Sequence, residues 1–213
     1  PLEMQPRRPL WRRLLRALLI ALFVFVVVSW LAVLLLRFVP PPTSAFMLER
    51  SISATLHGER DFDLRYRWVP WSNIAPVAPL AMVASEDQKF PFHHGFDFES
   101  IHDAMGDADR GERLRGASTI SQQTAKNLFL WNGRSFVRKG IEAYFTVLIE
   151  ATWPKRRILE VYANIAELGD GLYGVEAAAQ AYFGEHASQL NAHQAALLAA
   201  VLPDPRRLHA GRP

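Results

Sequence analysis

Residues 17–36 form an uninterrupted run of twenty uncharged residues, and Ser29 is the only plainly polar member of the run. A helix of that length rises about 30 Å, which matches the hydrocarbon core of a bilayer. A cleaved secretory signal is disfavoured because its apolar region is usually about 7–15 residues long, and no small-residue cleavage site precedes the prolines at 40–42. A buried core helix is disfavoured because the run is apolar on every face. The run therefore predicts one transmembrane helix, which we place at residues 17–37.

Charges on either side of this run predict its orientation. Residues 1–16 contain five arginines and one glutamate, whereas only Arg37 directly follows the run. Positively charged flanks stay in the cytoplasm, so we expect residues 1–16 to be a cytoplasmic basic tail and the chain from residue 38 onward to lie outside the cytoplasmic membrane. The prolines at 40–42 are expected to act as a stiff spacer between the span and the rest of the chain.

Composition limits the classes of protein to which the chain can belong. Half of its 213 residues are hydrophobic, enough for one domain plus the span, and the absence of cysteine excludes thiol nucleophiles and cysteine-ligated metals. The net charge of +3 is unevenly distributed, because residues 110–157 hold ten Lys or Arg against three Glu while residues 38–109 are acidic. No nucleic-acid-binding motif accompanies the basic segments, so we expect no nucleic-acid partner.

Hydrophobic periodicity predicts a mainly α chain beyond the span. Residues 38–79 are expected to be a linker and membrane-proximal segment with a short helix at 45–56, and residues 80–213 the principal domain. After residue 80 no alternating pattern is long enough to predict a strand. A glycine turn at 169–174 precedes an alanine-rich stretch at 175–182. The other predicted helices are at 79–88, 118–130, 135–152, 155–167 and 191–201, the last with Asn191 as its cap.

The first block of chemically active side chains runs from Glu86 to Asp97. Glu86 follows an apolar run and should be partly desolvated, which raises the pKa of a carboxyl group and suits a general base near neutral pH. The plainer interpretation of Glu86 and Asp87 is an exposed acidic pair at a helix end. The adjacent His93 and His94 suggest a metal, but neighbouring histidines point apart on a helix, so we expect no zinc site.

Two further blocks supply hydroxyls, amides and cations. Residues 116–123 look like a phosphate-binding loop, but they lack P-loop spacing and follow no strand, so nucleotide binding is a weak interpretation. Arg138 and Glu142 are four residues apart on one predicted helical face, where a surface salt bridge is the plainer alternative. The segments 128–131 and 136–137 are more apolar than a solvated loop needs, which fits either core packing or a lip that enters the bilayer.

Five blocks that follow in order between residues 80 and 202 resemble the motifs of the monofunctional biosynthetic peptidoglycan transglycosylases, members of glycosyltransferase family 51. The blocks are Glu86-Asp-x-x-Phe-x-x-His-x-Gly-x-Asp97, Gly116-Ala-Ser-Thr-Ile-Ser-Gln-Gln123, Arg138-Lys-x-x-Glu142, Lys155-x-x-Ile-Leu-x-x-Tyr-x-Asn164 and Ala177-Ala-Ala-Gln-Ala-Tyr-Phe-Gly184. The departures are Ala117 in place of a glycine, Ala163 in place of a leucine, and Gly140 and Ile141 where some relatives carry further cations.

The resemblance implies a lysozyme-like, mainly α globular domain with a small membrane-facing lobe. It implies polymerisation of lipid II into glycan strands by inverting glycosyl transfer, with release of undecaprenyl pyrophosphate. Glu86 takes the place of the catalytic base and Glu142 that of the second essential carboxylate, while Asn164 is expected to form hydrogen bonds at a helix end. The residues implied in binding substrate or pyrophosphate are Lys89, Phe90, His93, Ser118, Thr119, Gln122, Gln123, Lys126, Asn127, Arg134, Arg138, Lys139 and Tyr182.

The resemblance also implies partners and a location. The partners are lipid II, the growing glycan chain, the bilayer and other proteins of cell-wall synthesis or division, and the location is the bacterial cytoplasmic (inner) membrane. No cofactor is required, but a divalent ion, Mg or Mn, near Glu142 is left open. The rival enzyme class is a lysozyme-like hydrolase or lytic transglycosylase with Glu86 as an acid, although its neutral leaving group needs no cationic site. The non-enzyme rival is a membrane-tethered scaffold.

Overall fold

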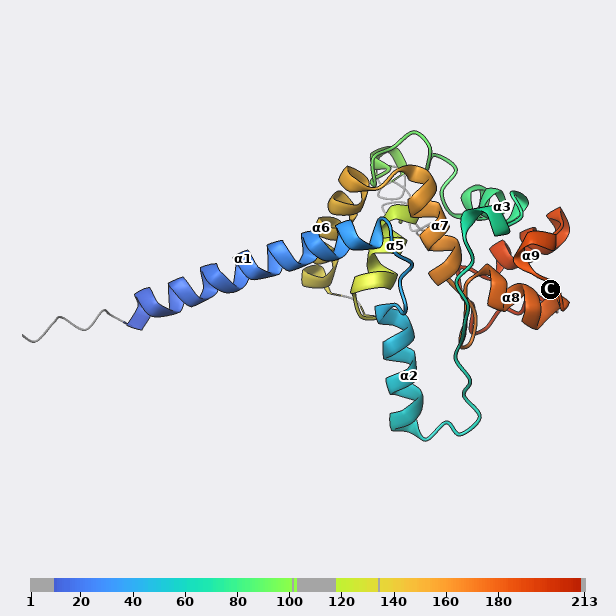
Figure 1. Ribbon diagram of the computed structural model, residues 1–213, viewed down its shortest axis with the longest axis horizontal. Coiled ribbons are helices and arrows are strands. Elements are labelled where there is room, and N and C mark those ends of the chain that lie inside the picture. The colour runs from blue at the N-terminus through green and yellow to red at the C-terminus, as the bar shows by residue number, and fades with distance from the viewer. Residues whose placement is uncertain (1–9, 101, 103–117, 134, 212–213) are drawn as a thin grey trace, which may run out of the picture.

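The computed structural model describes residues 10–100, 102, 118–133 and 135–211, and it is mainly α as predicted (Figure 1). Arg134 and the glycine-alanine pair at 116–117 lie outside the described residues. The elements in chain order are α1 (Leu10–Leu36), α2 (Ala45–His57), β1 (Arg65–Tyr66), η1 (Trp71–Asn73), α3 (Val77–Glu86), α5 (Ile120–Phe129), α6 (Phe136–Thr152), α7 (Lys155–Ile165), β2 (Glu167–Gly169), β3 (Leu172–Tyr173), α8 (Val175–Phe183), η2 (Ala187–Gln189) and α9 (Ala192–Ala200).

Side-chain caps explain where several helices begin. The side chains of Ser44, Thr119, Ser135 and Asn191 each accept a hydrogen bond from a backbone N–H in the first turn of α2, α5, α6 and α9. Such bonds satisfy N–H groups that have no partner within the helix. The predicted cap at Asn191 is therefore confirmed, and the predicted helix starts agree with the structure to within two residues at these positions.

The expectation that no strand follows residue 80 was wrong. β3 pairs with β1 in parallel and with β2 in antiparallel orientation, giving the order β1-β3-β2. Strands of two or three residues are too short for alternation to appear in the sequence. The predicted helix at 155–167 accordingly ends at Ile165, where the chain enters β2. Between β3 and α8 the chain needs glycine at 174, because φ is +84° and an added Cβ would lie 2.3 Å from the carbonyl oxygen of Asn164.

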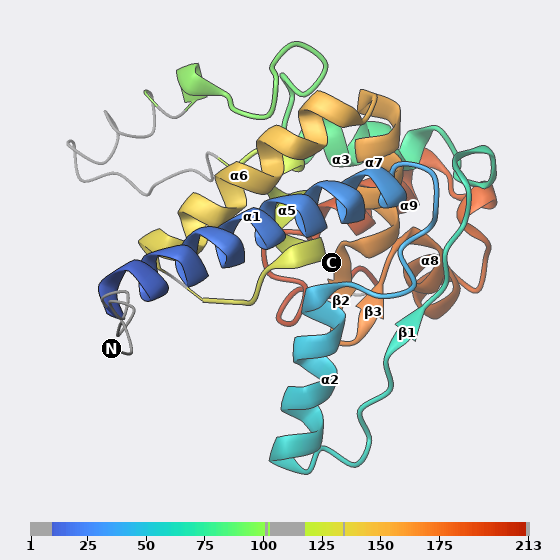
Figure 2. The ribbon, with the colours of Figure 1, turned by 60° about the vertical axis from the view of Figure 1, so that its left-hand side comes forward.

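The core is built around α5, which packs against both α6 and α7, while α3 packs against α9 (Figure 2). The side chains of Ile120, Ile149, Ile158, Val161 and Ile165 are fully buried there. The helix with the polar second block therefore runs through the centre of the domain. Its polar side chains must find partners inside the protein, because buried polar groups without partners are costly.

Among the described residues, α1 is the only helix long and apolar enough to cross a membrane, and it fits a single-pass membrane anchor. Its last turns are docked onto the domain. Ser29 and Val33 are buried, Ser29 Oγ lies 2.6 Å from the Tyr144 hydroxyl, and Trp153 Nε1 donates to the carbonyl of Val33 at 2.8 Å. Arg157 donates to the carbonyl oxygen of Leu36 at 2.8 Å. The bond from Arg157 pairs a carbonyl of the last turn of α1, where helix carbonyls lack i+4 partners, whereas the bond from Trp153 adds to the backbone bond that Val33 already accepts from Arg37.

The prolines at 40–42 do not separate α1 from the domain as the predicted spacer would. Pro41 is buried, and its carbonyl accepts a hydrogen bond of 2.6 Å from the Tyr66 hydroxyl. The carbonyl of Val39 accepts another, of 2.9 Å, from Arg157. The connection between α1 and α2 is therefore fastened to the domain at several points, and long-range bonds of this kind leave no local mark on the sequence.

Asn164 provides a test of how the domain is held together. Its side chain is fully buried at the end of α7, accepts from the N–H of Val69 at 2.8 Å, and donates to the carbonyls of Val69 and Glu160 at 2.9 Å each. Asn164→Ala leaves these buried groups unpaired and should lower the free energy of unfolding by about 3 kcal/mol. Asn73→Ala, at an exposed position, is the control, and thermal unfolding in detergent is the measurement. Equal melting temperatures for the two variants would contradict the assignment.

Candidate active site

Glu86 is the last residue of α3, half-buried, and it is oriented by α5 and α7. Its Oε2 accepts a hydrogen bond of 2.7 Å from Gln123 Nε2, and Gln123 Oε1 accepts one of 3.0 Å from the hydroxyl of Tyr162. Burial raises the pKa of Tyr162 well above its usual range, and the charges of Glu86 and Asp87 act in the same direction. Tyr162 therefore remains a donor, Gln123 is fixed in one orientation, and the carboxylate of Glu86 is held at a defined place.

Asp87 joins the first block to the second. Its buried carboxylate accepts hydrogen bonds from His93 Nε2 at 2.9 Å and from the backbone N–H of Ile120 at 2.9 Å. The N–H of Gly95 donates to His93 Nδ1 at 3.1 Å, so Nδ1 is an acceptor and the imidazole proton lies on Nε2. The structure thus places His93 against Asp87, at the junction of α3 and α5, while the adjacent His94 is exposed.

Thr119 and Gln122 use their polar groups to build the start of α5. The Thr119 hydroxyl accepts from the N–H of Gln122, the Gln122 amide accepts from the N–H of Thr119, and Thr119 Oγ1 donates to the carbonyl of Gly95 at 2.6 Å. Both side chains are buried, whereas Ser118 is exposed. Of these three predicted binding residues, the structure leaves Ser118 open to a ligand and gives Thr119 and Gln122 partners within the protein.

Glu142 is almost completely buried and holds two cations by its two oxygens. Arg138 Nη1 donates at 2.9 Å and Lys139 Nζ at 2.6 Å. Arg138 Nε is buried and has no hydrogen-bond partner among the described residues. An unpaired buried donor on a guanidinium is costly. Arg138 also lines a cavity, where a bound anion would pair with the charge of its guanidinium. The predicted salt bridge between Arg138 and Glu142 exists, but it is buried rather than exposed on the surface.

Lys126 lies next to these charges. Its Nζ is 5.3 Å from the centre of the Phe46 ring, and burial lowers the pKa of Lys126, while the charge of Glu142 opposes that shift. A desolvated ammonium group interacts strongly with a bound anion because little water screens it.

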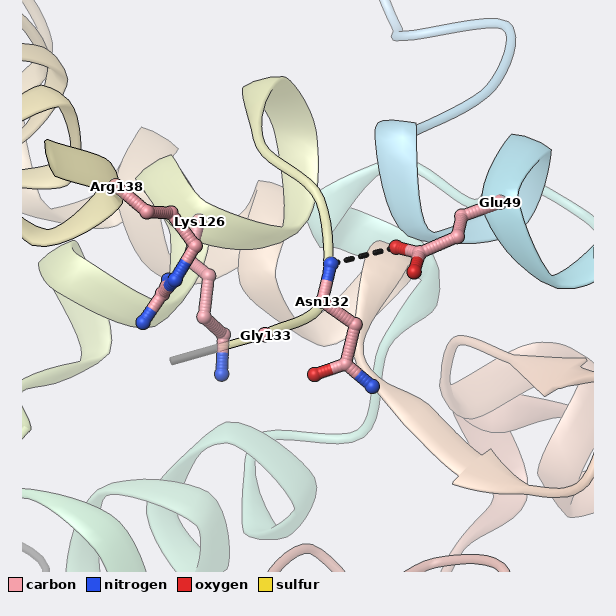
Figure 3. Close-up of a pocket in the computed structure, with 5 residues that line it drawn as sticks. All are labelled: Glu49, Lys126, Asn132, Gly133 and Arg138. Carbon is pink, nitrogen blue, oxygen red and sulfur yellow. Dashed lines mark hydrogen bonds between the residues drawn. The ribbon is translucent and has the colours of Figure 1, made fainter. Parts of the chain in front are cut away.

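Three adjoining cavities, which we together call the cleft, share lining residues and lie beside these groups. The first is lined by Glu86, Lys89, Ser118 and Pro203, among others. The second shares Pro203 with the first and brings in Gln123, Lys126 and Asn127. The third, with a volume of about 510 Å³, shares Lys126 and Asn132 with the second and is lined also by Glu49, Gly133 and Arg138 (Figure 3). The cleft therefore leads from the Glu86 carboxylate to a cationic end.

Two predicted binding residues lie elsewhere. Phe90 is buried in the core, with Lys155 Nζ 4.5 Å from its ring centre. Tyr182 lines another cavity with His209, which shares Pro205 and Arg206 with the second cavity, and its hydroxyl donates to the carbonyl of Leu168 at 3.0 Å. The structure does not bring Tyr182 together with Glu86 in one cavity. Their roles in binding remain predictions.

Glu49 and Asn132 also line the cleft, although neither belongs to the motifs in the sequence. Glu49 extends from α2 across the cationic cavity, and its Oε2 accepts a hydrogen bond of 2.6 Å from the backbone N–H of Asn132 (Figure 3). α2 falls in the segment that was expected to be a linker, and the contact joins positions 83 residues apart. Within that segment the sequence predicted a helix at 45–56, but it did not predict that this helix would line the cleft.

The surroundings of Glu142 do not fit a divalent metal ion. Both carboxylate oxygens accept bonds from cationic side chains, and a metal ion placed on them would lie against Arg138 and Lys139. Among the described residues no cluster of three His, Asp or Glu side chains could hold a metal. The chemistry derived below uses none.

A carboxylate held beside a cleft with a cationic end defines a class of enzyme that moves a proton at one point and stabilises negative charge at another. A family model described as Transglycosylase matches residues 53–212. The chain belongs to the transglycosylase family.

Proteins similar to this chain over nearly its whole length are named biosynthetic peptidoglycan transglycosylase. One from Xylella fastidiosa (strain 9a5c) is 56% identical over 205 residues, covering 96% of this chain and 83% of the relative. One from Xanthomonas campestris pv. campestris (strain B100) is 54% identical over 208 residues, covering 98% and 84%. One from Xanthomonas axonopodis pv. citri (strain 306) is 53% identical, with the same coverage.

Glu49 gives a test of the cleft. Glu49→Ala removes the acceptor that holds the N–H of Asn132, and it should raise the KM for substrate about fivefold with kcat little changed, since such a bond contributes about 1 kcal/mol. Glu49→Gln keeps an acceptor oxygen and should restore KM, while Ser53→Ala on the same helix is the control. The KM of each variant is measured by steady-state kinetics. A KM for Glu49→Gln as high as that of Glu49→Ala would contradict the role of the hydrogen bond and assign the effect to the negative charge.

Proposed function

We propose that this chain is the glycosyltransferase that polymerises lipid II into the glycan strands of peptidoglycan and releases undecaprenyl pyrophosphate. The observation that carries the proposal is the single cleft with the carboxylate of Glu86 at one part and Lys126 and Arg138 at another. Membership of the transglycosylase family and relatives named biosynthetic peptidoglycan transglycosylase support the same conclusion.

The reaction needs a base at the acceptor sugar. Glu86 takes the proton of the acceptor's 4-hydroxyl, and that oxygen forms a bond to the anomeric carbon of the donor chain. The bond from this carbon to the diphosphate oxygen breaks on the opposite side, so the configuration changes from α to β in one displacement. The hydrogen bond from Gln123 fixes one oxygen of Glu86, which leaves the other to receive the proton.

The leaving group carries the negative charge that develops as the bond breaks. Lys126 and Arg138 line the cavity that we assign to the diphosphate. Glu142 orients Arg138 and Lys139, so that their cationic groups can bind the oxygens of the diphosphate. Glu142 thus acts by holding the cations, not by taking a proton.

The hydrolase alternative is less consistent with this cleft. A hydrolase or lytic transglycosylase protonates a neutral glycosidic oxygen and gains nothing from buried cations at the leaving group. The scaffold alternative gives no reason for a buried guanidinium whose Nε has no partner in the part of the chain that the structure describes.

We infer that α1 anchors the enzyme in the cytoplasmic membrane with its N-terminus in the cytoplasm. Arg12, Arg13 and Arg16 lie at the N-terminal end of α1, on the side that the domain does not contact (Figure 1). The domain then lies outside the cytoplasm, where a lipid-borne substrate, the growing glycan and other proteins of cell-wall synthesis or division can reach it.

The role of Glu86 is tested by Glu86→Gln. The amide keeps the size and a hydrogen bond to Gln123 but cannot take a proton, so polymerisation should fall by at least about 10²-fold with the melting temperature unchanged. Glu185→Gln, at the end of α8 and outside the cleft, is the matched control. A well-folded Glu86→Gln enzyme that still elongates glycan would refute the assignment of the base.

The pKa of Lys126 predicts a pH dependence. Burial lowers this pKa, so above it Lys126 becomes neutral and its hold on a diphosphate weakens. The kcat/KM should therefore fall on the alkaline side at a lower pH than an ordinary lysine would give. Lys126→Arg keeps the charge at all accessible pH values and should move that fall upward. An unchanged alkaline limb in Lys126→Arg would contradict the assignment.

A further inference from the structure

α2 has two apolar faces, and the domain uses only one. Met47 and Ala54 are buried together with Arg50. Leu48, Ile52 and Leu56 are 53%, 58% and 79% exposed. These three residues, which we call the α2 stripe, are spaced by four and therefore lie along one side of the helix. Three large aliphatic side chains in a row on solvent are unfavourable, and such patches mark interaction surfaces.

The α2 stripe points away from the domain. Arg50 is two residues from Leu48 and from Ile52, which is roughly 200° around the helix. Its guanidinium binds Asp170 at 2.8 Å and Glu59 at 2.6 Å, on the side where α2 meets the β2–β3 turn. The stripe is therefore on the face opposite to that ion pair.

α2 is held in a fixed position relative to α1. The residues between the two helices are fastened by Arg157 at Val39 and by Tyr66 at Pro41, and α2 begins at the Ser44 cap. Figures 1 and 2 both show α2 running across the direction of α1, from the end of α1 that is docked on the domain. If α1 crosses the bilayer, α2 therefore runs parallel to the plane of the membrane.

Other exposed apolar side chains continue this surface. Phe38 follows α1 and is 75% exposed, and Phe136 at the start of α6 is 98% exposed. Trp131, 49% exposed, precedes Asn132, whose N–H is bonded to Glu49 of α2. The helices that carry the α2 stripe and the segment 136–137, α2 and α6, each contribute a residue to the cationic cavity, Glu49 and Arg138 (Figure 3).

We propose that the α2 stripe is a second membrane contact, with α2 lying in the lipid interface beside the point where α1 enters the bilayer. A helix of this kind buries its apolar face about 5–10 Å into the boundary between headgroups and acyl chains. The occupant is the lipid bilayer, because the stripe is continuous with an apolar anchor and runs along the membrane surface. A consequence, which rests on the proposed function, is that a lipid-borne diphosphate reaches Lys126 and Arg138 at headgroup level.

The natural absence of cysteine makes a direct test possible. Single variants Ile52→Cys and Leu56→Cys are labelled with an environment-sensitive fluorophore and reconstituted in phosphatidylethanolamine–phosphatidylglycerol vesicles. Val24→Cys, in the apolar part of α1, is the positive control. Ser188→Cys, in the exposed η2 turn, is the aqueous control. Each sample is quenched once with iodide in the water and once with lipids that carry nitroxides on their acyl chains.

Labels at Ile52 and Leu56 should lose most of their emission to the lipid nitroxides, as at Val24, and be protected from iodide relative to Ser188. Quenching by iodide but not by lipid would overturn the proposal, because the stripe would then face water. Protection from both quenchers would also overturn it, since a protein surface, such as a second copy, would cover the stripe. The quenching measurements need no catalytic activity, so their result is independent of whether the proposed function is correct.

An activity measurement adds a second, independent check. Ile52→Glu places a charge on the stripe, and it should reduce polymerisation of lipid II in vesicles several-fold while leaving the rate in detergent unchanged. Ser53→Glu, beside the stripe on the same helix, should leave both rates unchanged. Equal activity of Ile52→Glu and the wild type in vesicles would contradict a contact that delivers substrate.

Discussion

The buried carboxylate of Asp87 is the interaction on which the site depends. It receives hydrogen bonds from His93 and from the first N–H of α5 at Ile120. These bonds fasten the end of α3 to the start of the central helix, and at that junction Glu86 lies 2.7 Å from Gln123. A buried charge is tolerated only when it is fully paired, and loss of one partner costs several kcal/mol. The same bonds that make the charge tolerable therefore set the geometry of the proposed base.

Around this junction the polar residues divide into two groups. Thr119 and Gln122 form hydrogen bonds at the start of α5, and these bonds position the helix. Lys126 and Arg138 instead line the cleft, and Lys126 is desolvated there. An anionic ligand would pair with both cations, which is the physical reason to place the charged part of the substrate at that end. The anchor adds a further constraint, because the docked end of α1 fixes the orientation of the cleft relative to the membrane.

Much of this arrangement was predictable, and the rest was not for identifiable reasons. The cap at Asn191, the helices at 118–130 and 135–152 and the mainly α class follow from local patterns that the chain carries in full. The β strands were missed because two or three residues show no alternation. The role of Glu49, the docking of Trp153 on Val33 and the separation of Tyr182 from Glu86 depend on contacts between distant parts of the chain, and local sequence does not encode such pairings. The candidate residues of the site were found by motif, but which of them face the cleft could be learned only from the fold.

The central claim is that the cleft builds glycan from a lipid-borne diphosphate donor. The most direct measurement is incubation of the detergent-solubilised protein with labelled lipid II, followed by sizing of the products before and after digestion with lysozyme. The account predicts long products that lysozyme shortens. The absence of polymer together with breakdown of finished peptidoglycan would contradict it, and it would change the role of Glu86 from a base to an acid.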